Sequence, residues 1–187
     1  MDTFDPAAYG PAFAPLLAGD RLRTLGSGRG DANARRTLQA VTLATVFRDA
    51  HLVDLDMARC CLAGLWLLHD FLDESHSISQ QIETPSGSFW HGVMHRREGD
   101  FSNAKYWFRH VGPHEVFSEL GPAIAQLGLG DSKAVQRVTS GGAFDPYAFV
   151  DACEAAVRSG DDLACREIQR LEWEHLFDHC YRTATGA

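Results

Sequence analysis

The stretch MARCCLAGLWLL, residues 57–68, decides the fold class. Wound as a helix, it is apolar on nearly every side, which is typical of a helix inside a bundle rather than one on the surface. No part of the chain alternates apolar and polar residues for long enough to indicate a sheet. The sequence therefore predicts an all-α protein, an irregular helical bundle around a central apolar helix at about residues 55–80.

The segments around this helix are predicted to complete one domain. With 187 residues, 45% of them apolar, the chain can bury a core of its own, so residues 1–187 are expected to fold together. Residues 1–30 are rich in Gly, Ala and Pro and should be partly flexible. Turn and cap signals predict a helix from an N-cap at Asp31 to residue 46, a turn at 83–87, and helices at 88–98, 103–111, 115–120, 122–127, 146–159 and 162–180.

Charge and cysteine content restrict the classes of function. A net charge of −8 disfavours binding to nucleic acid or to an anionic membrane, because both repel an acidic surface. Five cysteines without a CxxC pair indicate reduced, buried thiols rather than a zinc knuckle. The first residues lack the basic and apolar segments of a secretion signal. We therefore expect a cytoplasmic protein.

The histidines indicate where chemistry is expected. Six of the nine lie between His69 and His114. Two trios have the spacing i, i+4 and i+7, which places their members on one face of a helix: these are His69, Asp73 and His76, and then His91, His95 and Glu98. Converging imidazole and carboxylate groups suit zinc, iron or manganese. The predicted metal ligands are His69, Asp73, His76, His91 and His95, although a solvated helix face would show the same spacing.

The same segment contains candidates for catalysis and for anion binding. His91 and His95 are candidate general acids or bases, with Glu98 as their partner. Four cations cluster in an otherwise acidic chain, and they could hold a carboxylate or phosphate beside a helix N-terminus. Equally, they could form ion pairs with Asp70, Asp73, Glu98 or Asp100. The predicted ligand-binding residues are Arg96, Arg97, Asn103, Lys105, Trp107, Arg109 and His114.

A further acidic and histidine-rich array near the C-terminus is expected to be solvated surface. It comprises Glu172, His175 and His179, which lie beside Trp173 on an otherwise charged face.

Residues 89–117, FWHGVMHRREGDFSNAKYWFRHVGPHEVF, resemble a family of uncharacterised bacterial and fungal proteins. The shared blocks are Trp90-His91, residues 94–98 (MHRRE), residues 103–109 (NAKYWFR) and Gly112 with His114; residues 68–80 resemble the same family. His110 departs from it, where a second arginine is expected. The resemblance implies no activity, substrate or cofactor.

Two interpretations follow from these patterns. In the first, a pocket lined by residues 69–114 binds a small polar or anionic molecule, with or without metal-dependent catalysis; whether the protein is an enzyme stays open. In the second, the same polar residues form a buried network in a non-catalytic module. That network would support a homo-oligomer or partner interface, with Trp90, Tyr106 and Trp107 as exposed contact residues.

Overall fold

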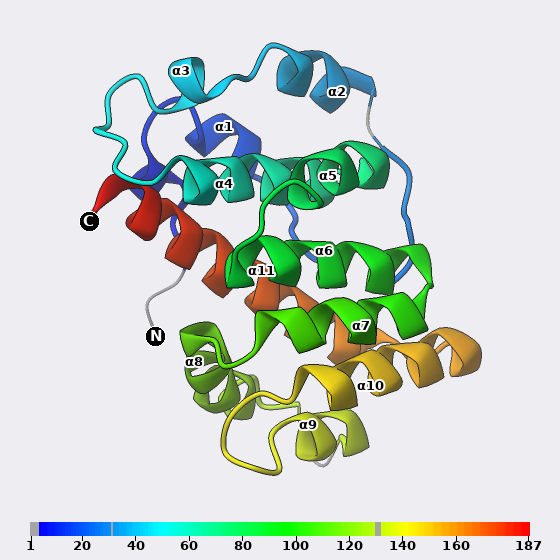
Figure 1. The fold of residues 1–187 in the computed structure, drawn as a ribbon. Helices are drawn as coiled ribbons and strands as arrows, with labels where there is room; N and C mark the ends of the chain where they lie inside the picture. Colours follow the sequence, from blue (N-terminus) through cyan, green and yellow to red (C-terminus); the bar gives the residue numbers. More distant parts are fainter. Residues whose placement is uncertain (1–3, 31, 130–131) are drawn as a thin grey trace.

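The computed structural model describes residues 4–30, 32–129 and 132–187, and these contain helices and no strands (Figure 1). The predicted all-α class is confirmed. The predicted N-cap Asp31 lies outside the described residues. Along the chain the elements are η1 (Pro6–Tyr9), α1 (Ala14–Leu17), α2 (Ala32–Gln39), α3 (Leu43–Val46), α4 (Leu55–Leu68), α5 (Leu72–Ser79), α6 (Pro85–Glu98), α7 (Phe101–Val111), α8 (Glu115–Ala125), α9 (Lys133–Val138), α10 (Pro146–Ser159) and α11 (Leu163–Thr185).

The predicted helix over residues 55–80 is divided into α4 and α5. Asp54 caps α4 by accepting hydrogen bonds from the backbone N–H groups of Asp56 and Met57. The helix then ends at Leu68, and Asp70 adopts a φ of 63°, a left-handed conformation that no α-helix can continue. The prediction that His69, Asp73 and His76 share one helical face is therefore wrong.

Helix α6 is the most deeply enclosed element that the structure describes. Every residue from Ser86 to Arg97 is buried, because α4 and α5 pack on one side and α7 on the other (Figure 1). The predicted turn at residues 83–87 is instead its start: Thr84 caps the helix through the N–H of Gly87, and Pro85 occupies the first position. Gly99, with a φ of 90°, ends it.

The long C-terminal helix α11 packs against α4 and α8 and lies behind α6 in Figure 1. Trp173 on α11 donates a hydrogen bond from Nε1 to the carbonyl oxygen of Gly64 in α4, 2.9 Å away. The N-terminal segment joins the same core, because Tyr9 and Phe13 pack edge-on against Phe177 of α11. Thus the C-terminal helix α11 packs against both the N-terminal segment and α4.

Other boundaries also differ from the predictions. Pro122 lies inside α8, where two short helices were expected, and the helix predicted up to residue 46 is interrupted between α2 and α3. The five cysteines are buried and unpaired. Across the described segments, no helix combines the length and the apolar character needed to cross a membrane.

Candidate metal centre

Three histidines from two neighbouring helices converge beside α7. His76 lies on α5, and His91 and His95 lie one turn apart on α6. One nitrogen from each ring can be chosen so that all three atoms lie within 4.8 Å of one another. No other group of three or more potential metal ligands converges in this way among the described residues. It combines one member of the first predicted trio with two of the second.

Helix α7 forms the wall opposite these histidines. The Trp107 ring stacks on the His91 ring with centroids 3.9 Å apart and planes 15° apart. One turn earlier, the Asn103 side-chain Nδ2 lies 3.1 Å from Nε2 and 3.4 Å from Nδ1 of His95. Asp100 starts this helix by accepting a hydrogen bond from the Asn103 backbone N–H, so the helix begins two residues before the predicted start at residue 103. Two predicted ligand-binding residues, Asn103 and Trp107, therefore contact the histidines.

Glu98 orients His95 rather than joining the three converging nitrogens. Its carboxylate lies 3.0 Å from His95 Nδ1 and its side chain is 54% exposed. Because a carboxylate only accepts, this contact places the proton on Nδ1 and leaves the lone pair on Nε2. A carboxylate bonded to the far nitrogen is the usual partner of a metal-binding imidazole.

His91 is buried as a neutral ring. Burial, followed by the nearby rings of His95 and His76, lowers its pKa to about 3. Its Nδ1 is buried without a hydrogen-bond partner among the described residues. A neutral imidazole with an unused nitrogen suits a metal ligand. A pKa so far below 7 does not favour the predicted role of His91 as a general acid or base in the metal-free protein.

Two of the predicted metal ligands lie apart from this cluster. Neither His69 nor Asp73 belongs to the convergent group. His69 follows the end of α4, and its Nε2 donates a hydrogen bond to the Leu16 carbonyl oxygen at 2.9 Å. Asp73 is exposed in the first turn of α5. The physical cause is the chain reversal at Asp70, which turns α5 away from the line of α4.

The four predicted anion-binding cations do not gather in one pocket. Arg96 is buried and pairs through both terminal nitrogens with Glu172 of α11, and Arg97 is buried and pairs with Asp70. Lys105 lies 2.5 Å from Asp151 of α10, whereas Arg109 is exposed beside the Tyr106 ring. The two buried arginines therefore form ion pairs, which was the alternative prediction to anion binding. The interface contact predicted for Trp90 is also wrong, because that ring is fully buried.

Glu172 is a structurally important residue, and the prediction that it lies on the surface is wrong. Its side chain is fully buried. The signal was available in the spacing, because Glu172 lies four residues after Ile168 and four before Leu176, both on the buried stripe of α11. The charged residues next to Glu172 in the sequence led to the surface prediction.

His114 belongs to a separate group at the start of α8. Its Nδ1 accepts a hydrogen bond from the Val116 N–H, and its Nε2 lies 3.1 Å from the Ser86 hydroxyl. Burial, and then the neighbouring His179, lowers its pKa to about 4, with Glu115 acting in the opposite direction. The structure thus separates His114 from the predicted ligand-binding residues around His91.

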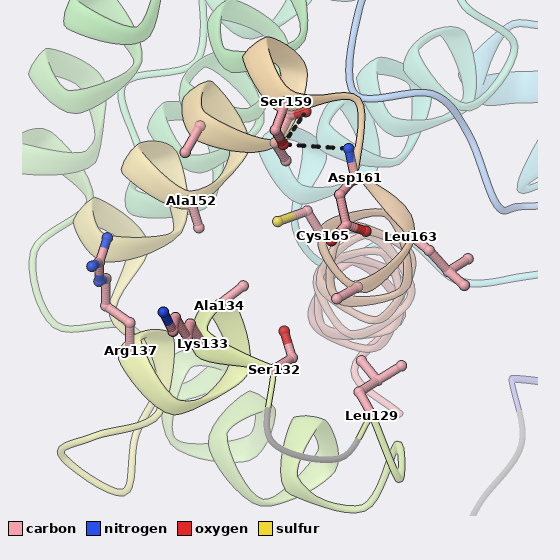
Figure 2. Close-up of a pocket in the computed structure, with 13 residues that line it drawn as sticks. Leu129, Ser132, Lys133, Ala134, Arg137, Ala152, Ser159, Asp161, Leu163 and Cys165 are labelled. Atoms are coloured by element: carbon pink, nitrogen blue, oxygen red, sulfur yellow. Dashed lines mark hydrogen bonds between the residues drawn. The ribbon is translucent and has the colours of Figure 1, made fainter.

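A cavity of about 640 Å³ lies between α9, α10 and α11, and none of the predicted site residues lines it (Figure 2). Its wall is mainly alanine and leucine, with Lys133 and Arg137 on α9 and Cys165 on α11. Figure 2 shows the Cys165 sulfur directed into the space between α10 and α11. None of the three converging histidines lines this cavity.

Comparison with protein-family models, with curated proteins and with solved structures gives no match.

Proposed function

We propose that the protein binds a divalent transition-metal ion through His76, His91 and His95. The convergence of three imidazole nitrogens within 4.8 Å carries the proposal. Burial of His91 and His95 supports it, as does the unpartnered Nδ1 of His91. A buried imidazole nitrogen without a partner loses its hydration, and a bound ion would compensate that loss.

The donor set favours zinc or ferrous iron over manganese. It consists of three neutral nitrogens, whereas manganese prefers carboxylate and water ligands. In a tetrahedral site with metal–nitrogen bonds of about 2.1 Å, the nitrogens lie about 3.4 Å apart. The three atoms here lie within 4.8 Å, so a shift of about an ångström between side chains completes the site. Three protein ligands leave one tetrahedral position open, as in catalytic zinc sites.

A direct titration tests metal binding. Purified without an affinity tag, the protein is expected to bind one equivalent of Zn²⁺ in isothermal titration calorimetry. His91→Ala should weaken that binding by more than about 100-fold, because a ligand is removed from the ion itself. The exposed His51 provides the matched control, and His51→Ala should bind Zn²⁺ like the wild type. Unchanged affinity in both His76→Ala and His91→Ala would overturn the proposal.

The role of Glu98 predicts a smaller effect. Glu98→Gln is expected to weaken Zn²⁺ binding by about 10- to 100-fold, because the carboxylate no longer fixes the tautomer and orientation of His95. Glu83→Gln, at an exposed position just before α6, is the control. If both variants bind Zn²⁺ equally well, Glu98 has no positioning role.

A further inference from the structure

The three histidines approach the proposed metal from α5 and α6, so the side facing α7 decides what else can bind. There the structure places the Asn103 amide beside His95 and the Trp107 ring against His91. Glu98, the carboxylate that contacts this cluster, is bonded to Nδ1 of His95 and leaves the lone pair of Nε2 available. An uncharged polar group and an aromatic wall therefore border the position that the histidines leave open.

The Asn103 amide lies beside the His95 ring and not in line with its Nε2 lone pair. Its Nδ2 is 3.1 Å from Nε2 and 3.4 Å from Nδ1, and these near-equal distances place it off the in-plane direction of that lone pair. The lone pair that Glu98 keeps on Nε2 can therefore bind an ion while the amide stays where it is. The amide donor then lies next to the metal, where a ligand oxygen or nitrogen on the open metal position can accept its hydrogen bond.

We propose that the open metal position takes a small monoanion, such as hydroxide, a short carboxylate or azide, and that Asn103 donates a hydrogen bond to it. This inference rests on the proposed metal site. Three neutral imidazoles leave the full charge of a divalent ion uncompensated, which favours an anion as fourth ligand. The stacked Trp107 ring limits the space over His91 and so favours a small ligand.

Cobalt substitution tests this inference by spectroscopy rather than by activity. The protein loaded with Co²⁺ should show visible d–d absorption that shifts when sodium azide is added. Asn103→Ala should keep Co²⁺ binding but weaken azide binding by about tenfold, which is the scale of one hydrogen bond to a charged group. Asn103→Asp should bind Co²⁺ more tightly and lose the azide response, because its carboxylate takes the open position. Ser102→Ala, at an exposed neighbouring position on α7, should behave like the wild type.

The outcomes separate the two proposals. If the wild type does not bind Co²⁺ or Zn²⁺, the metal site itself is wrong. If Co²⁺ binds but azide leaves the spectrum unchanged, the open position does not accept an anion. If azide binds equally well to wild type and Asn103→Ala, an anion binds but Asn103 does not select it. Either of the last two results overturns the present inference while leaving the metal site in place.

Discussion

Glu172→Leu is expected to lower the free energy of unfolding by about 3–5 kcal/mol, because it leaves the buried Arg96 guanidinium without its counter-charge. The side chains of Arg96 and Glu172 are 1% and 0% exposed, and they join α6 to α11. Arg96 also packs over the Phe149 ring at 4.3 Å, and this ring does not neutralise its charge once the carboxylate is lost. Urea unfolding followed by circular dichroism measures the change.

Two further variants show that the effect comes from the unpaired charge. Arg96→Met combined with Glu172→Leu should recover most of the lost stability, since the buried charges are removed together. The exposed pair Arg158 and Glu154 provides the control, and Glu154→Gln should change stability by less than about 0.5 kcal/mol. If the double variant also retains wild-type Zn²⁺ affinity, Arg96 has a structural role and not a ligand-binding one. A stable Glu172→Leu single variant would contradict the buried ion pair.

Acidification from pH 7 to pH 4 in the presence of a chelator should destabilise the protein by about 3 kcal/mol through His91 and His114. Their folded-state pKa values, about 3 and about 4, lie below the ordinary value of 6.5. The unfolded chain therefore binds protons more readily than the folded chain. The stabilising contribution is fully present above pH 6.5 and is lost as the pH falls toward 4 and then 3. The expected loss of stability is smaller than the full contribution of about 1.36 kcal/mol per pKa unit. The reason is that His114 is partly exposed, so solvent screens its charge.

Substitution of the two histidines identifies the source of this pH dependence. His91→Gln and His114→Gln should each flatten the curve of unfolding free energy against pH, and the double variant should flatten it further. His110→Gln, on the exposed side of α7, is the control and should leave the slope unchanged. Equal slopes in the wild type and the double variant would show that other groups cause the acid instability.

The sequence predicted those features of the fold that depend on local signals. The helices predicted at residues 88–98 and 146–159 end where expected, at Gly99 and Gly160 in left-handed conformations, and Asp145 caps the start of the second. The break after α4 escaped prediction because the apolar pattern continues through Leu72 while the reversal depends on the conformation of Asp70. Within an apolar run, periodicity alone carries no signal for such a reversal.

The candidate site was predicted in part. His76, His91 and His95 were identified, but the spacing grouped them by helix, whereas their convergence results from the packing of α5 against α6. Spacing along one helix cannot show which residues meet across two. The arginines illustrate the same limit, because the partner of Arg96 lies 76 residues away on α11.

The burial of α6 from residue 86 to residue 97 also has an evolutionary consequence. A surface helix offers neutral positions on its solvent face, so substitutions accumulate there with the helical period. Helix α6 has no such face along these three turns: His91 and His95 point to the proposed metal, and Arg96 and Arg97 enter ion pairs on other sides. Sequence drift in this helix should therefore be slow at consecutive positions, and change at one residue should require compensating change in a neighbouring helix.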